Sequence, residues 1–356
     1  MFKLEEKDFT MVDYPKRVPF ASFLPGVAGK NGIPMWVYYV NRGQAIAGFG
    51  IENKDNPIFD FVPANNAYRR TELNGFRTFI LSDGKVTEMF SSNSKFKPEM
   101  TIKQNGLKLY ENNTDLGVEV TVEYLNVTSK DYPGLIRTVS INSKKEVEVL
   151  DGIATIYPRG MNNEAIKNMA NLSVAWIDVV DVLGMKLYKN RSTTADTAEM
   201  SAVEDGNFYA SFNDAGEMYD VVYDLDFMFG TNTSLLSPIE FDENLKNNFK
   251  NQVHANKLPC AFTYANGKNI NIHTVIGSVD NVDILKTNSE EFCVDFINNQ
   301  KMLAEQLVKD ITNPIETVTS EPLFDSYMSQ SYLDNVLRGG YPLVLEGEEE
   351  DIVYHI

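Results

Sequence analysis

The segment from Trp36 to Ile80 carries residue types that are typical of carbohydrate recognition. It has five basic residues against four acidic ones, in a chain whose formal net charge is −18: Arg42, Lys54, Arg69, Arg70 and Arg77, with Glu52, Asp55, Asp60 and Glu72. Aromatic residues are interleaved with them: Tyr38, Tyr39, Phe49, Phe59, Phe61, Tyr68, Phe76 and Phe79. Aromatic faces stack on the C–H faces of sugar rings, while amides, guanidinium groups and carboxylates bind the hydroxyl groups. An ordinary β-hairpin with internal ion pairs explains the same residues, so both interpretations stay open.

A phosphate-binding loop is a second candidate, because PGVAGKNG (Pro25–Gly32) contains a Gly-Lys pair. Such a loop needs a glycine five residues before Gly29, where Leu24 stands, and a Ser or Thr where Asn31 stands. A plain loop between two strands is the better interpretation.

Histidine and carboxylate chemistry has little support. The histidines, His254, His273 and His355, are scattered and have no second His or Cys at metal-ligand spacing, so we expect no metal site. A sugar epimerase of the mutarotase type needs a His acid that faces a carboxylate base, and His254 or His273 could serve. No Gly-x-Ser-x-Gly nucleophile motif is present, and the acidic run Glu346–Asp351 is interpreted as solvated surface.

Composition limits the partners and the location. A net charge of −18 repels nucleic-acid backbones and anionic membranes but is compatible with a neutral sugar. Cys260 and Cys293 make no disulfide framework, and the N-terminus lacks the apolar core of a signal peptide. No run approaches the roughly 18 apolar residues of a membrane helix. A reduced, cytoplasmic location is expected.

Short alternating runs dominate from about Phe20 to Leu285. Asn-Gly and Asp-Gly turns separate them, for instance at Asn31, Asp83 and Asp151. This pattern predicts a mainly β, antiparallel sandwich. One helical interruption is expected over Asn162–Leu172, followed by a strand over Val174–Val182.

Helices are predicted after the strands. Ser289 is a good N-cap, and Phe292, Phe296, Leu303, Leu307 and Ile311 follow at helical spacing up to Pro314. A second helix is predicted from Pro322 to Arg338. The 356 residues therefore divide into a β domain, 1–286, and a helical part, 287–356.

Several blocks resemble the N-terminal region of cellobiose-phosphorylase-like inverting glycoside phosphorylases, most of all the β-1,3-oligoglucan phosphorylases. They are Phe23–Ile80, including VNRGQAIAGFGIENKD, then FMFGTNTSLLSPIEF (Phe227–Phe241), NKLPCAFTYANGKNINIHTVIG (Asn256–Gly277) and YLDNVLRGGYPL (Tyr332–Leu343). The resemblance is collinear over essentially the whole chain.

The resemblance implies a galactose-mutarotase-like β-supersandwich followed by linker helices and the start of an (α/α)₆ barrel. In such enzymes orthophosphate, the co-substrate, attacks the anomeric carbon while an Asp of the barrel protonates the leaving oxygen. That Asp lies outside these residues, so no catalytic residue and no other cofactor is assigned, and the chain alone is expected to be inactive.

The resemblance also implies partners: a β-glucan oligosaccharide, the chain's own barrel domain and a second copy in a homodimer. In such a homodimer, loops of the N-terminal domain form part of the wall of the partner's active site. The positions that match are Asn41, Arg42, Glu52, Asn53, Lys54, Tyr68, Arg69, Arg70 and Arg77. Glu52 or Asp55 is expected to pair internally with an Arg.

Two alternatives stay open. One is a stand-alone sugar-binding sandwich or scaffold without catalysis. The other is a free-standing mutarotase-like epimerase that uses His254 or His273.

Overall fold

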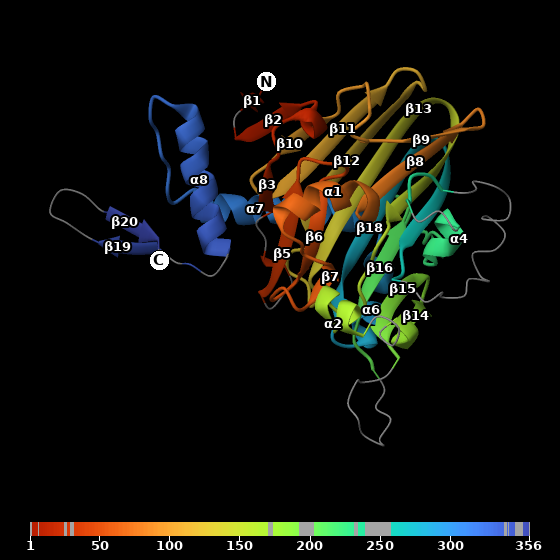
Figure 1. Cartoon of the computed structure of the whole chain (residues 1–356). Coiled ribbons are helices and arrows are strands. Elements are labelled where there is room, and N and C mark those ends of the chain that lie inside the picture. The colour runs from red at the N-terminus through yellow and green to blue at the C-terminus, as the bar shows by residue number, and fades with distance from the viewer. Residues whose placement is uncertain are drawn as a thin grey trace.

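The structure is a computed structural model. It describes residues 2–5, 7–24, 27–28, 32–169, 174–191, 203–230, 234–238, 258–337, 340, 342–345 and 352–355. Two sheets packed face to face form its main body, and helices follow them along the chain (Figure 1). This confirms the predicted mainly β, antiparallel fold with helices after the strands.

The large sheet has 13 strands, all paired antiparallel. Its main path runs through β1 (Phe2–Glu5), β2 (Asp8–Val12), β10 (Glu99–Ile102), β11 (Gly106–Asn113), β12 (Val118–Asn126), β13 (Gly134–Ile153), β18 (Ala261–Val279), β16 (Gly206–Phe212), β15 (Met185–Asn190) and β14 (Ile177–Val182). Off this path lie β8 (Phe76–Ser82), β9 (Lys85–Glu88) and β17 (Val221–Val222).

Two long strands hold the large sheet together. β13 has 20 residues and β18 has 19, and they pair along their whole length, with one irregularity between Asn142 and Val147. The first half of β13 pairs with β12 and its second half pairs with β8. One strand therefore joins both parts of the sheet.

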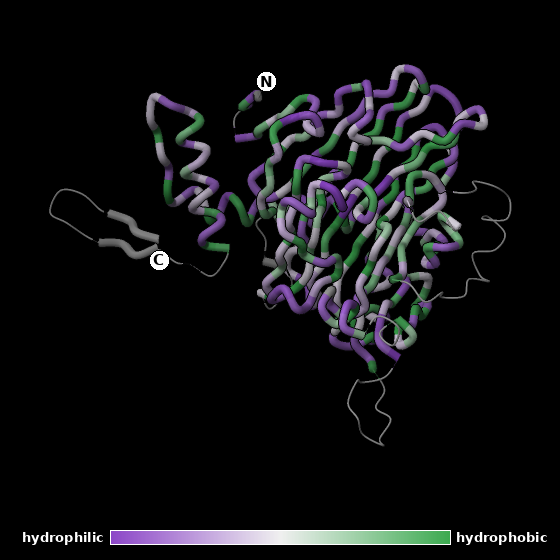
Figure 2. Tube along the Cα trace, viewed as in Figure 1, coloured by the Kyte–Doolittle hydropathy of each residue, from purple (hydrophilic) through white to green (hydrophobic). Residues whose placement is uncertain are grey.

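The small sheet contains β3 (Ala21–Leu24), β4 (Val27–Ala28), β5 (Ile33–Val40), β6 (Ile46–Ile51) and β7 (Pro57–Phe59). Because side chains alternate along a strand, Met35, Val37 and Tyr39 of β5 point into the core shared with the large sheet. Val118, Val120 and Val122 of β12 do the same from the facing side. The apolar residues follow the strands and the hydrophilic ones gather at the turns (Figure 2).

Helix α1 (Ala64–Asn74) covers part of the outer face of the small sheet, where Val40, Ala47 and Ala67 pack together. The hairpin interpretation of this segment missed it. α1 is short and mostly polar, and few of its residues are buried, so its apolar periodicity is weak.

The helical interruption is α2 (Asn163–Asn168), whose N-cap Asn162 accepts a hydrogen bond from the Ala165 amide at 2.9 Å. Residues 170–172 of the predicted helix lie outside the described residues. The predicted strand after it begins late, because Val174–Trp176 is a 3₁₀ turn, η2, and β14 starts at Ile177. Two other short elements are η1 (Tyr14–Lys16) and α4 (Leu225–Phe229).

The last strand of the large sheet ends at Val279, earlier than the predicted Leu285. Asn281 caps α6 (Val282–Asn288), which spans the predicted division at 286/287. Ser289 does not cap the long helix, because Ser289–Glu291 forms a 3₁₀ turn, η4, and Cys293 is the N-cap residue.

The long helix is α7 (Val294–Thr312), followed by α8 (Pro322–Leu337), which agrees with the second predicted helix to within a residue. The predicted Phe296 is buried, whereas the predicted Leu303, Leu307 and Ile311 are only partly buried. The other buried residues of α7 are Ile297, Gln300, Ala304, Val308 and Thr312. Gln300 escaped the pattern because it is polar: its side-chain oxygen accepts a hydrogen bond from the Thr128 amide at 2.6 Å. A hairpin of β19 (Pro342–Leu345) and β20 (Ile352–His355) comes last among the described elements. In the part of the chain that the structure describes, no helix is both long and apolar enough to cross a membrane.

Candidate functional site

The turn between β5 and β6 is buried rather than open to a ligand. Asn41 is 0% exposed, and its amide nitrogen donates to the carbonyls of Tyr14 and Val18, each at 3.0 Å. Its side-chain oxygen accepts a hydrogen bond from the Phe20 amide at 2.8 Å. The Asn41 side chain thus fixes the chain before β3, and all of these hydrogen bonds are internal.

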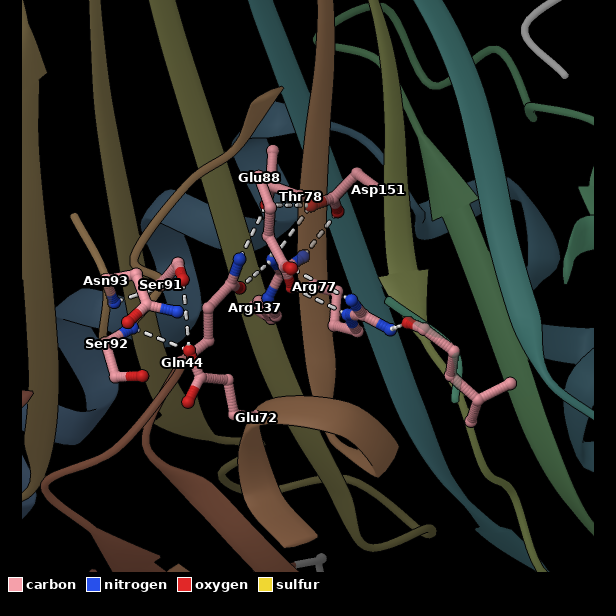
Figure 3. Close-up of polar contacts among 11 residues, drawn as sticks. Gln44, Glu72, Arg77, Thr78, Glu88, Ser91, Ser92, Asn93, Arg137 and Asp151 are labelled. Atoms are coloured by element: carbon pink, nitrogen blue, oxygen red, sulfur yellow. Dashed lines mark hydrogen bonds and ion pairs between the residues drawn. The ribbon is translucent and has the colours of Figure 1, made fainter. Parts of the chain in front are cut away.

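A buried ion pair adjoins this turn (Figure 3). Arg137 and Asp151, both on β13, form a two-fold contact in which one Arg137 nitrogen lies 2.8 Å from the carboxylate, and both side chains are fully buried. Gln44 accepts from Arg137 at 2.5 Å and donates to Thr78 at 2.8 Å, and Thr78 donates to Asp151 at 2.6 Å. Burial alone would lower the pKa of Arg137, but the Asp151 carboxylate raises it above its ordinary value. Such charges are tolerated in a core only when paired.

Arg77 is also internal. Its guanidinium group donates to both carboxylate oxygens of Glu88, at 2.6 and 2.8 Å, and to the Leu235 carbonyl. It lies 4.6 Å from the ring centroid of Phe79. Burial raises the pKa of Glu88 despite this ion pair. Arg77 therefore joins β8 and β9 to the described segment 234–238.

Arg42 and α1 form a second group. The Arg42 guanidinium donates to the Asn41 carbonyl at 2.6 Å and to the Arg17 carbonyl at 3.3 Å, and lies 5.8 Å from the ring centroid of Tyr68. Arg69 is exposed. Arg70 hydrogen-bonds Tyr157, whose pKa is raised to about 12 by burial and then by Asp60, with Arg70 opposing.

The turn between β6 and β7 holds the third group. Glu52, Asn53 and Lys54 are exposed and lie at the opposite end of β6 from Arg42. A six-residue strand spans roughly 20 Å, so Arg42 and Lys54 do not share one site. Among the described residues, Asp55 pairs with Lys54 at 2.7 Å and Glu52 accepts from Asn56 at 3.3 Å. The expected pairing of either acid with an Arg is therefore wrong within the described part of the chain.

Aromatic side chains gather on the outer face of the small sheet, beside the β6–β7 turn. We call Phe23, Trp36, Tyr38 and Phe61 the aromatic surface; Phe61 is exposed, Phe23 and Trp36 are half-buried, and Tyr38 lies buried beneath Phe61. The Phe61 ring lies 5.0 Å from Tyr38, 6.1 Å from Trp36 and 6.3 Å from Phe23, measured between ring centroids. Of the aromatic residues noted in the sequence, five point inward instead: Tyr39, Phe49, Phe59, Phe76 and Phe79.

Two glycines of β6 make room for these rings. Gly48 and Gly50 pair with Tyr38 and Trp36 across β5–β6, so they share the outer face with them. A Cβ at Gly50 would lie 2.7 Å from the Trp36 ring, and one at Gly48 would lie 3.2 Å from the Phe61 Cα. The rings can therefore lie low against the sheet, and Phe61 remains 37% exposed.

Polar groups border the aromatic surface at one end. The Trp36 indole N–H donates to the Asn53 carbonyl at 3.0 Å, which holds the ring against the β6–β7 turn. The Lys54 ammonium group and the Glu52 carboxylate are on the same turn. Apolar ring faces beside amide, ammonium and carboxylate groups suit a hydroxylated ring as ligand.

His273 faces a carboxylate but is poorly placed for catalysis. Its Nε2 lies 2.8 Å from Asp214, its Nδ1 lies 3.1 Å from the Thr138 hydroxyl, and the residue is 3% exposed. Both ring nitrogens are engaged, which leaves none for a substrate. His254 lies outside the described residues. Within the described ranges, no group of three His, Cys, Asp or Glu side chains could hold a metal ion.

Sequence reasoning missed the Arg137–Asp151 pair and the role of Trp36. The signal for the pair was a charge within an apolar strand, as in GLIRTVSI and VEVLDGI. The signal for the aromatic surface was strand parity: Trp36 and Tyr38 alternate with the inward residues of β5.

Comparisons with known proteins found no matching family model and no matching curated protein. The solved structures that are similar in part include the following three. A polysaccharide lyase matches with a TM-score of 0.39 and 8% identity over 73% of this chain and 34% of its own. A bacterial glucoamylase complexed with acarbose matches with a TM-score of 0.36 and 8% identity over 91% of this chain and 41% of its own.

The third structure is named "Putative kojibiose phosphorylase from human microbiome" and matches with a TM-score of 0.29 and 6% identity. The match covers 94% of this chain and 33% of the length of that structure. The chain thus spans between a third and about two fifths of the length of these structures. At these TM-scores the similarities carry no argument about function.

Proposed function

We propose that this chain is the N-terminal sandwich and linker of an inverting glycoside phosphorylase and that it binds oligosaccharide rather than supplying the catalytic acid. The observation that carries the proposal is the aromatic surface with its polar turn. The resemblance of the sequence blocks supports the same assignment. The activity of the whole protein is part of the proposal.

The arrangement of the small sheet favours binding over a plain hairpin with ion pairs. Ion pairs account for Arg77 but not for the aromatic surface, where Phe61 stays 37% exposed. The exposed part of the Phe61 ring leaves apolar area in water that a bound sugar ring would bury.

The proposed chemistry is a single displacement. Orthophosphate attacks the anomeric carbon of a β-glucoside, the C–O bond to the leaving sugar breaks, and the leaving oxygen takes a proton from a carboxylic acid. The products are a sugar 1-phosphate of inverted configuration and a shortened chain. We assign that acid to a barrel domain. We propose that the exposed Glu52, Asn53, Lys54 and Arg69 face the substrate, and that the homodimer contact lies on the same side of the chain.

Calorimetric titration of the chain with β-1,3-linked glucose trisaccharide tests the binding. Trp36→Ala and Phe61→Ala should each weaken binding by about tenfold, because central aromatic residues dominate such interfaces. Met302→Ala is the matched control, since Met302 is an exposed apolar residue on α7. Equal affinity of all three variants would overturn the proposal, provided that their melting temperatures agree.

The second candidate is a sugar-binding sandwich with no link to phosphorolysis. The aromatic surface favours this candidate equally, so a binding measurement does not distinguish it from the phosphorylase proposal. Adding the trisaccharide and orthophosphate to the chain alone should yield no sugar 1-phosphate. Turnover by the chain alone would contradict the assignment of the acid to another domain.

A further inference from the structure

A groove of about 1030 Å³ lies between helix α8 and the edge of the sandwich. Its sandwich wall is built from β1, β2, β3, the chain before β3, Tyr39 of β5 and the β10–β11 turn, and α8 forms the facing wall. Figure 1 shows α8 beside this edge of the sandwich. Aromatic residues line both walls: Phe20, Phe23 and Tyr39 on one, Phe324 and Tyr327 on the other. This volume is at the upper end of the usual range for ligand sites.

Helix α8 is fixed in place while its groove-facing residues are left uncovered. The Gln104 side chain donates to the Ser329 hydroxyl at 3.0 Å, and Gln330 donates to the Gln104 carbonyl at 3.0 Å. Leu333 and Leu337 pack on Val308 of α7. In contrast, Phe324 is 47% and Tyr327 is 66% exposed.

The groove lining is mostly apolar, and its polar groups carry charges of both signs. Lys7, Arg17 and Lys103 come from the sandwich wall, Glu321 immediately precedes α8, and Asp334 lies on α8. Tyr39 hydrogen-bonds Ser22, and its pKa is raised to about 12 by burial and then by Asp334 on the other wall. Gln330 donates to Asp334 at 2.9 Å. A mostly apolar, aromatic lining with a few charged groups of both signs suits the C–H faces and hydroxyl groups of a neutral sugar better than an anion or a cation.

Phe23 connects the groove to the aromatic surface. Its ring stacks on Phe61 and packs 5.1 Å from Tyr38 on the outer face, and the same residue lines the groove. The aromatic residues thus continue across the edge strand β3, from Trp36 to Tyr327.

We propose that the groove between β3 and α8 binds further sugar units of the oligosaccharide that the aromatic surface holds, the chain crossing β3 at Phe23. The ligand class is then an extended neutral oligosaccharide, not a mono- or disaccharide. The inference rests on the proposed function.

The dependence of affinity on chain length tests it. The full chain is titrated with β-1,3-linked di-, tri- and hexasaccharides, together with Trp36→Ala, Tyr327→Ala and Met302→Ala as the control. The hexasaccharide should bind at least about fivefold more tightly than the trisaccharide, because one further sugar ring would stack on an aromatic side chain of the groove. Tyr327→Ala should remove this gain and leave trisaccharide binding unchanged, whereas Trp36→Ala should weaken both. Tyr327→Phe should retain the gain.

The outcomes separate the two proposals. If affinity does not rise beyond the trisaccharide, or if Tyr327→Ala has no effect on the hexasaccharide, the groove does not bind sugar, while the effect of Trp36→Ala still supports the aromatic surface. If no oligosaccharide binds, both proposals are wrong. Circular dichroism of Tyr327→Ala checks that α8 remains helical.

Discussion

Gly50 lies directly across the β5–β6 pair from Trp36, and the missing side chain leaves the space that the indole ring occupies. A Cβ there would also come within 2.4 Å of the Asn56 carbonyl and 2.8 Å of the Pro57 Cα. The glycine thus determines both the position of the ring and the path of the β6–β7 turn.

Gly50→Ala should therefore move Trp36 and destabilise the sheet. Overpacking of this kind costs about 1–3 kcal/mol of unfolding free energy. Tryptophan fluorescence and urea unfolding measure the two effects, and trisaccharide affinity should fall with them. Unchanged fluorescence and affinity would mean that the ring position does not depend on Gly50. Met302→Ala is the control, because Met302 is an exposed residue of α7.

Removing one partner of the buried pair should be more costly than removing both. Arg137→Met leaves the Asp151 carboxylate uncompensated in the core and should lower the free energy of unfolding by about 3–5 kcal/mol. The double variant Arg137→Met/Asp151→Leu should be less destabilised than that. Urea unfolding monitored by circular dichroism measures both, and additive losses would show that the two side chains do not act as a pair.

Asn41→Ala should affect folding and not ligand binding. Its amide satisfies three main-chain groups before β3, and leaving buried groups unpaired costs about 1–3 kcal/mol each. The melting temperature should fall, while trisaccharide affinity at a temperature where the variant is folded should be unchanged. Lys54→Ala should have the opposite effect: its melting temperature should be unchanged, and its affinity for the trisaccharide should be lower. Loss of affinity in a stable Asn41→Ala variant would place this residue in the binding site after all.

Acid should destabilise the fold through His273. Burial lowers its pKa below the ordinary value of 6.5, with Asp214 opposing and Lys301 adding to the effect. The unfolded chain therefore binds the proton more readily, so the contribution of neutral His273 is complete above pH 6.5 and is lost as the pH falls through the folded-state pKa. The Asp214 pKa is itself lowered from 3.8, so its contribution is lost only at more acidic pH.

Melting temperatures between pH 7.5 and 5 measure the effect. The wild type should lose stability over this range, and His273→Gln should be less stable at neutral pH but show a smaller loss on acidification. Equal pH dependence of the two proteins would assign the titration to another group. His273 packs against β13 through Thr138, against the turn after β16 through Asp214, and beside Phe212.

The sandwich follows from sequence alone because alternation with period two is a direct consequence of strand geometry, as in Val118, Val120 and Val122. Helix α7 was predicted for the same kind of reason, and Phe292 and Phe296 of the predicted face are buried. Gln300 was not predicted to be buried, because a hydrogen bond rather than hydropathy stabilises it there. The start of the helix was misplaced because Ser289 belongs to a separate 3₁₀ turn.

The candidate site was predicted only in part. Composition pointed to the segment that holds the aromatic surface, but it could not separate Tyr39 and Phe59, which face the core between the sheets, from Tyr38 and Phe61, which lie on the outer face of the small sheet. Arg42 and Lys54 are close in sequence, yet a strand between them sets them apart. Register and pairing decide these matters, and they depend on residues far away along the chain.

Strand β13 has a consequence for how the molecule comes apart. Its main chain is hydrogen-bonded to β12, β8 and β18. Because β12 and β8 pair with opposite halves of β13, fraying that begins at one half is opposed by the hydrogen bonds of the other half. We expect the amides of β13 and β18 to be among the slowest to exchange with deuterium, and the sandwich to unfold as one cooperative unit in which no part of the large sheet survives the rest.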